Sequence, residues 1–273
     1  IVKHDHTTFH VIDLPGIYSL STYSYEERIT RDFLIDNQVD VIINVVDAGN
    51  LERNLYLTTQ LLELGIPTVV ALNMVDMTEK MGIRIDVNQF SRMLGVRTVT
   101  TVASKEEGTK EILDAAMEAA RCAKTDPPRS AKHDVELEME ISKLQEKLIF
   151  KPDCKLPQRW LILRTLEGDQ EIHSRLLENV ENPDFVMEQI SSVRRHLEEQ
   201  FRDDLEMVIA DGRYGFIGGL IREVVSKPGT ANRFMMTESI DNILLHKWIG
   251  LPIFIVLMWL TFKLTFDIGG HFV

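Results

Sequence analysis

The stretch TVVALNMVD, residues 68–76, joins an uninterrupted apolar run to a polar tail that carries Asn73 and Asp76. A run without a polar face is typical of a strand that is buried on both sides of a sheet. Comparable β-branched runs occur elsewhere, and amphipathic stretches with helical spacing separate them. The strand-like runs are FHVID (9–13), VDVIINVVD (39–47) and TVTTV (98–102), and the helix-like stretches are 25–37, 53–64, 86–94 and 109–123. This alternation predicts an α/β fold with a mostly parallel sheet that helices cover on both faces.

Ligands of such sheets bind beyond the carboxyl ends of the strands, and three polar segments are predicted to lie there. The first is DLPG, which consists of Asp13, Leu14, Pro15 and Gly16 and fits the DxxG pattern of GTPases. In that pattern the acid holds the water shell of Mg²⁺, and the glycine lets a backbone N–H approach the γ-phosphate. By itself, however, Asp-x-Pro-Gly is also an ordinary turn.

The second segment is NMVD, formed by Asn73, Met74, Val75 and Asp76, and it fits the NxxD pattern that reads guanine. The Asp76 carboxylate can accept two N–H bonds from guanine that adenine does not supply, and the Asn73 amide can bond the base edge and brace neighbouring loops. Most GTPases have lysine where this chain has Met74, whose thioether could cover one face of the base. Taken alone, NMVD could equally be an Asx turn at a strand end.

The third segment is VASK, residues 102–105, which precedes a glycine and a predicted helix. It contributes Ala103, Ser104 and Lys105, and the backbone N–H groups of Ser104 and Lys105 would meet the guanine carbonyl. Each segment is a weak signal alone, but three of them in this order, each at a strand end, predict a P-loop GTPase-like domain. Its ligands would be GTP or GDP and Mg²⁺, with Asp13 holding the metal through water.

Two parts of a GTPase site are missing from this sequence. There is no GxxxxGK[ST] phosphate loop for the β- and γ-phosphates, so we expect the chain to be truncated at its amino end and to bind GTP poorly by itself. Ile17 follows Gly16 where Ras-like enzymes place the glutamine that orients water. An apolar side chain cannot orient water, which predicts that hydrolysis in the intact protein is slow or needs another group to position the water. The missing phosphate loop predicts an inactive enzyme in this chain.

The strand pattern stops at KTDPPRSAKHD, residues 124–134, a linker by its prolines and polarity. Downstream stretches with helical spacing are 134–149, 156–167, 169–179 and 183–226, and Lys227-Pro228-Gly229 is expected to stop the last one. The 18-residue stretch 249–266 carries one charge, Lys263, and is long enough to cross a bilayer, with a buried core helix as the alternative. We therefore predict a G domain at 1–125, an all-helical domain at 126–232, a juxtamembrane linker at 233–248 and a transmembrane helix at 249–268.

The charge balance excludes some classes of protein. Lys and Arg number 30 against 42 Asp and Glu, a formal net charge of −12, which argues against nucleic acid as a partner. The two cysteines form no CxxC, which argues against a disulfide scaffold or a thiolate zinc site.

His246 and Lys247 precede the apolar stretch, and basic flanks favour the cytosolic side, so residues 1–245 are predicted to be cytosolic.

Histidines gather near the start of the chain, in KHDHTTFH at residues 3–10. With strand spacing, His4, His6 and His10 would share one face, and with Asp5 they could hold a metal. A solvated strand face is the simpler interpretation of the same residues.

Several segments together resemble signatures of the FeoB family of bacterial ferrous-iron transporters. These are VIDLPGIYSL (11–20), SYEERITRDFL (24–34), ALNMVDMTEKMGIRID (71–86), ADGRYGFIGGLI (210–221) and ESIDNILLHKWIGLPIFIVLMWLTF (238–262). The resemblance covers essentially the whole chain, and both Ile17 and Met74 match the habit of that family. It implies a switch II at about residues 17–28 that begins with Ile17, Tyr18, Ser19 and Leu20, and a helical domain that resembles a nucleotide-dissociation inhibitor.

The resemblance also implies a role. The family imports Fe²⁺ across the bacterial cell inner membrane under the control of a cytosolic GTPase, and Fe²⁺ would be the transported ion rather than a ligand of this segment. The implied partners are the membrane, guanine nucleotide, the remaining transmembrane domain of the same protein, small Feo accessory proteins and further copies in a homo-oligomer. The alternative is a soluble or membrane-tethered regulatory GTPase of the ribosome-assembly or signalling type. The apolar stretch and the acidic balance argue against an RNA-handling GTPase.

Overall fold

The computed structural model describes residues 1–5, 7–21, 24–122 and 133–226, together with some helical positions between Pro252 and Thr265. The chain divides into two compact units, residues 1–226 and residues 227–273. Among the described residues, no helix combines the length and the apolar character that a bilayer crossing requires. The linker predicted at 233–248 and most of the membrane segment predicted at 249–268 lie outside the described residues, so both stay predictions.

The centre of the first unit is a parallel sheet of three strands, in the order β3 (Ile42–Asp47), β4 (Thr68–Asn73) and β6 (Thr98–Thr101). All three were predicted from their β-branched runs, and the parallel arrangement is confirmed. The register aligns the last residues of the strands, Asp47 with Asn73 and Asn73 with Thr101. The carboxyl ends of the strands therefore meet at one edge of the sheet.

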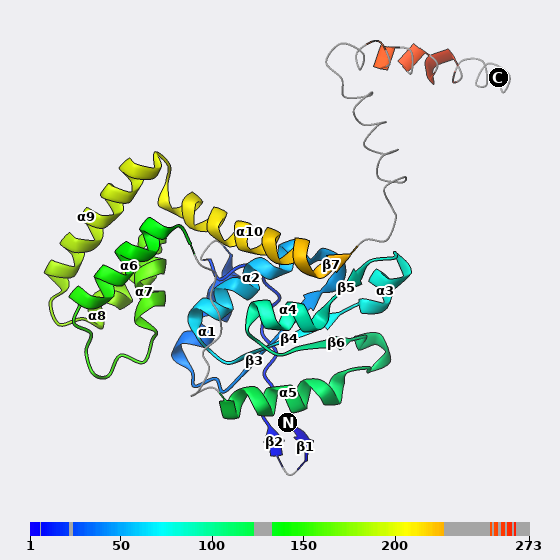
Figure 1. The fold of residues 1–273 in the computed structure, drawn as a ribbon, viewed down its shortest axis with the longest axis horizontal. Coiled ribbons are helices and arrows are strands. Elements are labelled where there is room, and N and C mark those ends of the chain that lie inside the picture. The colour runs from blue at the N-terminus through cyan, green and yellow to red at the C-terminus, as the bar shows by residue number, and fades with distance from the viewer. Residues whose placement is uncertain are drawn as a thin grey trace. The chain divides into compact units, whose positions relative to one another are not determined.

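Helices cover both faces of this sheet (Figure 1). On β4, Val70 and Leu72 belong to the core that α2 (Leu51–Leu64) and α4 (Val87–Leu94) complete. Because side chains alternate along a strand, Val69 and Ala71 point to the other face, where α5 (Thr109–Cys122) packs. This double burial explains why β4 reads as a continuous apolar run.

The first strand-like run of the sequence, FHVID, is not a strand, and that prediction is wrong. Instead β1 (Val2–His4) and β2 (Thr7–Phe9) form an antiparallel hairpin, and residues 10–13 belong to no strand. Val11 and Ile12 are 56% and 60% exposed. In the described part of the chain, no neighbouring strand pairs with residues 10–13, and β-branched residues do not hold an extended ladder without a partner.

The helical part follows the predicted pattern with one correction. Its helices are α6 (Val135–Lys147), α7 (Gln158–Glu167), α8 (Gln170–Glu178), α9 (Pro183–Phe201) and α10 (Leu205–Val224). The single helix predicted at 183–226 is two helices, because Arg202 adopts a left-handed conformation (φ 56°) and Asp204 begins α10 as its N-cap. Helix α10 also ends before the predicted stop at 227–229, since Val225 and Ser226 form β7, which pairs with β5 (Arg84–Ile85).

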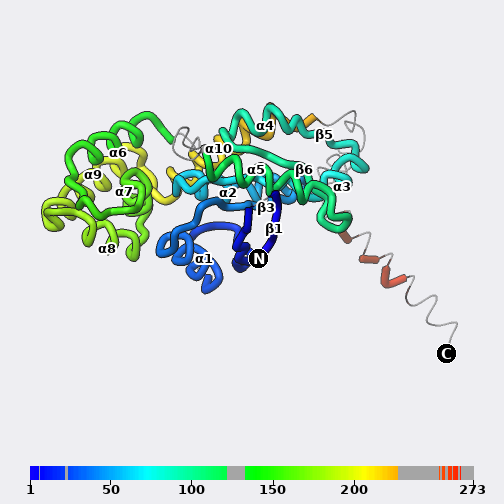
Figure 2. The backbone as a smooth tube through the Cα atoms, turned by 90° about the horizontal axis from the view of Figure 1, so that it is seen from below, coloured from blue at the N-terminus to red at the C-terminus, as the bar shows by residue number. Residues whose placement is uncertain are grey.

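Helix α10 joins the sheet region to the helical bundle (Figure 2). Near its start it packs against α7 and α9, and further along it packs against α2 and α4. Ile217, Leu220 and Val224 of α10 are part of the core beside the sheet. Residues 1–226 are thus one packing unit, and the domain boundary at residue 125 stays a prediction from composition.

A buried ion network lies where α2, α7 and α10 meet. Arg213 is fully buried, and its guanidinium donates to both carboxylate oxygens of Glu63, at 2.9 Å each, and to both oxygens of Glu167, at 2.5 and 3.1 Å. His133 adds a fourth member, with Nε2 at 3.5 Å from Glu63 Oε1. Burial alone would raise the pKa of Glu63, but the charge and hydrogen bonds of Arg213, together with the nearby His133 ring, lower it from 4.5 to about 2.

Glu63 should therefore make the fold sensitive to acid. Its folded pKa lies below its unfolded pKa, so the unfolded chain binds this proton first; the stabilisation is complete above pH 4.5 and disappears as the pH falls through about 2. We expect this one carboxylate to account for about 3 kcal/mol of the free energy of unfolding lost over that window. Urea unfolding at a series of pH values measures it, and Glu63→Gln should show a shallower pH dependence. Identical pH profiles for the two proteins would contradict this assignment.

Candidate functional site: loops at the carboxyl edge of the sheet

The end of β4 holds two of the predicted loops together. The side-chain oxygen Oδ1 of Asn73 accepts a hydrogen bond from the backbone N–H of Ala103, at 3.0 Å, and one from the hydroxyl of Thr101, at 3.3 Å. Asn73 thus braces the loop after β6, as its place in the sequence predicts. The Thr101 contact follows from the strand register, which sets Thr101 beside Asn73.

Asp76 of the NMVD loop forms an ion pair with Lys105 of the VASK loop. Its carboxylate oxygen Oδ2 lies 3.6 Å from Nζ of Lys105 and 3.7 Å from Nζ of Lys80, and its side chain is 24% exposed. Both lysines are more than half exposed, so these ion pairs are weak and readily exchanged. The carboxylate is therefore accessible to a ligand with N–H donors, which could displace these lysines.

Met74 occupies a strained backbone position between the two acceptor residues. Its φ of 61° is left-handed, where residues other than glycine cost about 1–2 kcal/mol. It is the N-cap of α3 (Val75–Lys80), and its carbonyl accepts the Met77 N–H at 3.0 Å. Its side chain is 49% exposed. Strain of this kind gathers at functional sites, and here it leaves an apolar side chain open beside Asp76.

The loop after β6 is a tight turn seated on its own strand. Ala103–Lys105 form a short 3-10 helix, and Ser104 and Lys105 are exposed. Gly108 follows with a φ of 86°, and a Cβ built on it would lie 2.4 Å from the Thr100 carbonyl oxygen. Only glycine fits there, so Gly108 fixes how closely this loop returns to β6.

The DLPG segment lies in a loop, and among the described residues it does not directly follow the end of a strand. Asp13 and Gly16 are exposed, and a Cβ built on Gly16 would meet no atom within 4 Å. Further along, the ring of Tyr18 lies under the guanidinium of Arg53, 3.7 Å from its carbon, and Leu20 is buried. Within the described residues, no hydrogen bond or ion pair joins residues 13–20 to NMVD or VASK.

Three residues that sequence reasoning missed touch these loops. Thr101 bonds Asn73, Arg53 covers Tyr18, and Arg164 donates to the Leu20 carbonyl oxygen at 3.0 Å. Thr101 could have been found from strand alignment, since it ends the neighbouring strand. Arg164 lies 144 positions from Leu20, and no local pattern indicates that contact.

Candidate metal ligands gather elsewhere in the described residues. One group joins His4 and Asp5 with Asp114 of α5, and the His4 Nε2 atom lies 2.7 Å from the Asp114 carboxylate. Of the histidine face predicted for a metal, His6 lies outside the described residues and His10 is in no strand. A second group joins Glu136, Glu140 and His196 on α6 and α9. Neither group includes Asp13, whose exposed carboxylate has no partner among the described residues and fits the role of holding the water shell of Mg²⁺.

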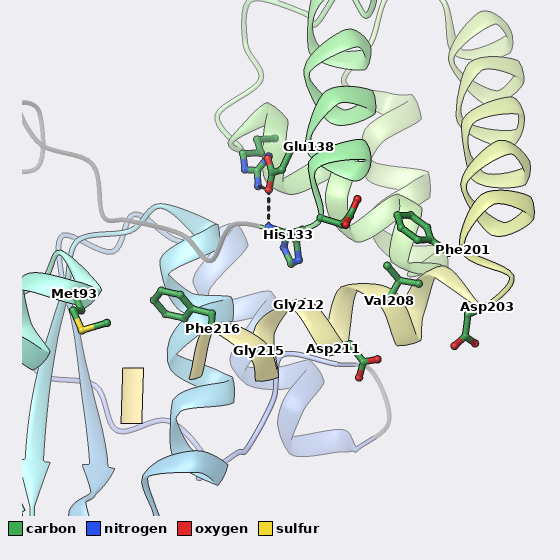
Figure 3. Close-up of a pocket in the computed structure, with 12 residues that line it drawn as sticks. Met93, His133, Glu138, Phe201, Asp203, Val208, Asp211, Gly212, Gly215 and Phe216 are labelled. Atoms are coloured by element: carbon green, nitrogen blue, oxygen red, sulfur yellow. Dashed lines mark hydrogen bonds and ion pairs between the residues drawn. The ribbon is translucent and has the colours of Figure 1, made fainter. Parts of the chain in front are cut away.

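A groove of about 1210 Å³ lies apart from all of these loops, between α4 and the helical part. Figure 3 shows Met93 and Phe216 on one side of it and Phe201 and Val208 on the other. Glu138 in its wall accepts the His133 backbone N–H at 3.0 Å and is also paired with an arginine of α7. None of the predicted site residues lines this groove.

Two family models match this chain. The model described as Ferrous iron transport protein B matches residues 1–116, and the model of the FeoB cytosolic helical domain matches residues 133–226. The chain is 40% identical over 272 residues to the Fe(2+) transporter FeoB of Salmonella typhimurium, covering 95% of this chain and 32% of that protein. It is 35% identical over 277 residues to the Fe(2+) transport protein A/Fe(2+) transporter FeoB fusion protein of Porphyromonas gingivalis, covering 99% of this chain and 33% of that protein. The chain thus spans about a third of the length of these relatives.

Solved structures agree with the family models. A GDP-bound mutant of the S. thermophilus FeoB G-domain superposes with a TM-score of 0.70 at 36% identity, covering 78% of this chain and 80% of that one. The mGMPPNP-bound NFeoB of S. thermophilus superposes with a TM-score of 0.68 at 35% identity, covering 81% of this chain and 80% of that one. Sequence and fold agree along nearly the whole first unit, and this chain belongs to the FeoB family of ferrous iron transport proteins.

Proposed function

We propose that this chain is the guanine-nucleotide-binding, cytosolic part of a ferrous iron transporter, and that its GTPase activity controls iron uptake. The observation that carries the proposal is the bracing of two predicted base-reading loops by one side chain, the Asn73 oxygen that accepts from Ala103 and Thr101. A carboxylate that accepts two N–H bonds discriminates between guanine and adenine, and the partly exposed Asp76 carboxylate supports this role. The relatives bound to GDP and to mGMPPNP support the same ligand class.

Each predicted residue has a role in this proposal. Asp76 reads the guanine edge, Met74 covers one face of the base, and the backbone N–H groups at Ser104 and Lys105 bond its carbonyl. Val75 and Ala103 set the spacing within these loops, as Leu14 and Pro15 do within DLPG. Bound Mg²⁺ would supply charge compensation for the phosphates, with Asp13 holding its water shell and the Gly16 backbone open to the γ-phosphate.

Hydrolysis is expected to be slow. Ile17 stands where a water-orienting glutamine would be needed, and an aliphatic side chain offers neither donor nor acceptor. Switch II, which begins with Ile17, Tyr18, Ser19 and Leu20, would then act mainly as a sensor of the bound nucleotide. Ile17 would therefore limit the rate of GTP hydrolysis, whereas nucleotide binding would not depend on this side chain.

The membrane and the transported ion belong to the same proposal. The apolar stretch 249–268 would enter the bacterial inner membrane, with residues 1–245 in the cytosol. Fe²⁺ would pass through the remaining transmembrane domain as the substrate. A relative whose printed name joins Fe(2+) transport protein A to FeoB supports a small accessory protein as a partner. A homo-oligomer stays a prediction.

Calorimetric titration of the full-length protein with GDP and with ADP tests the nucleotide assignment. We expect GDP to bind and ADP to bind at least roughly a hundredfold more weakly, because adenine lacks the donors that the Asp76 carboxylate accepts. Equal affinity for the two nucleotides, or no binding of either, would show that these loops do not form a guanine site.

A further inference from the structure

Two packed helices of the helical part bring three side chains of metal-ligand type together. Glu136 and Glu140 lie four residues apart on α6, so their side chains share one face of that helix. His196 comes from α9, which packs against α6. One ligand atom from each of the three residues lies within 4.8 Å of the other two. The group therefore forms only where the fold brings the two helices together.

The spacing of these ligand atoms suits a single metal ion. Zn²⁺ binds carboxylate oxygen and imidazole nitrogen at about 2.0–2.2 Å, so two ligands of one ion lie about 3 Å apart when adjacent and about 4.3 Å apart when opposite. The limit of 4.8 Å is slightly wider than that. Glu136 is partly exposed and His196 is exposed, so rotation about their side-chain bonds can close the difference without a movement of the helices.

The charges around this group favour a cation. Two carboxylates four residues apart on a helix repel each other, and Glu140 is only 9% exposed, which limits screening by water. Among the described residues, Lys143 is the one cation paired with the group, with Nζ 2.6 Å from Oε1 of Glu140. The hydrogen bond to Glu140 and the negative charges of Glu140 and Glu136 raise the pKa of Lys143. Lys143 is half exposed, so an incoming ion can displace its ammonium group into solvent.

The chemistry of the three ligands selects one class of ion. Imidazole nitrogen suits Fe²⁺, Ni²⁺, Cu²⁺ and Zn²⁺, whereas Mg²⁺ and Ca²⁺ are bound mainly by oxygen. In the described part of the chain, neither the His196 ring nor the Glu136 carboxylate has a hydrogen-bond or ion-pair partner, so metal binding would break no contact of these two side chains. The exposure of His196 gives an ion a path from solvent.

We propose that Glu136, Glu140 and His196 form a binding site for one divalent first-row transition-metal ion, which would join α6 to α9. Three protein ligands leave the remaining coordination positions to water. No residue of DLPG, NMVD or VASK belongs to the group, so the site depends neither on nucleotide binding nor on the proposed function. This class of ion includes Fe²⁺, for which the sequence predicted no ligand in this segment.

Calorimetric titration of this chain with Zn²⁺, after bound metal has been removed with a chelator, tests the site. We expect the wild type to bind one Zn²⁺ ion that His196→Ala binds at least roughly tenfold more weakly, because one of three ligands is lost. His173→Ala is the matched control, since His173 lies on α8 of the same helical part and does not belong to the group. Equal affinity for Zn²⁺ in the wild type and in His196→Ala would overturn the proposal.

Unfolding in urea distinguishes a metal site from a role of His196 in folding. Zn²⁺ should move the midpoints of the wild type and of His173→Ala to higher urea concentration, because the ion binds where the fold holds α6 against α9. It should not move the midpoint of His196→Ala, and all three proteins should unfold alike without metal.

Glu136→Gln supplies a second variant at a partly exposed position, and it should lose the Zn²⁺-dependent shift as His196→Ala does. A shift that persists in both variants would overturn the site. An equal shift with Mg²⁺ in the wild type would overturn the assignment to transition-metal ions, because oxygen ligands alone would then account for binding.

Discussion

Replacing Arg213 with methionine is expected to lower the free energy of unfolding of residues 1–226 by about 3–5 kcal/mol. Arg213 is fully buried and is the cation that Glu63 and Glu167 share. Methionine fills much of the same volume but leaves Glu63 charged, buried and without a compensating cation, and a lone buried charge costs far more than a broken surface pair. Urea unfolding followed by circular dichroism measures the change.

Arg222 offers a control on the same helix. It is exposed near the end of α10, so Arg222→Met should change the free energy of unfolding by less than about 0.5 kcal/mol. The double variant Arg213→Met with Glu63→Met should recover part of the loss, because an apolar pair of similar volume can replace a buried ion pair. If Arg213→Met unfolds at the same urea concentration as the wild type, the network does not hold the two parts together.

The second large effect is expected at the base-reading carboxylate. In the full-length protein, Asp76→Asn should weaken GDP binding by at least roughly a hundredfold, because the amide presents a donor where guanine also presents donors. The same amide matches the C2 carbonyl of xanthine, so XDP should bind the variant more tightly than GDP does. Competition of GDP and XDP for a fluorescent nucleotide measures both changes.

Asp86→Asn serves as the matched control for this substitution. Asp86 caps α4 by accepting the Gln89 N–H at 2.9 Å, and asparagine caps a helix equally well. This variant should keep the wild-type preference for GDP. A preference for GDP that survives in Asp76→Asn would assign guanine recognition to other groups.

The meeting of the NMVD and VASK loops at neighbouring strand ends could be predicted from local sequence. The register that aligns Asn73 with Thr101 follows from two apolar runs of similar length, and parallel strands must end at one edge. Bracing of Ala103 by Asn73 follows from the same alignment. The strand predicted at residues 9–13 was wrong because β-branched residues indicate a strand only where a neighbour can pair with it, and sequence does not reveal the neighbour.

The helical part shows the same limit. Helical spacing continues through residues 183–226. The helix nevertheless breaks at Arg202, where the sequence has no glycine or proline to indicate an end. The end of α10 was placed too late because the pairing of β7 with β5 depends on residues about 140 positions away. The ion network was also invisible, because Glu63, Glu167 and Arg213 each look like ordinary charges on amphipathic helices.

The sequence by itself determined the parallel sheet, the order of its loops and the residue types that guanine recognition needs, because strand burial and loop position are properties of short segments. Only the tertiary structure decided that Arg164 donates a hydrogen bond to the Leu20 carbonyl oxygen. The same is true of the ion pairs by which Arg213 connects α2 to α7. Those contacts link residues 144 and 150 positions apart. A buried charge is stable only where its partner is brought to it, and that depends on how the helices pack rather than on any local pattern.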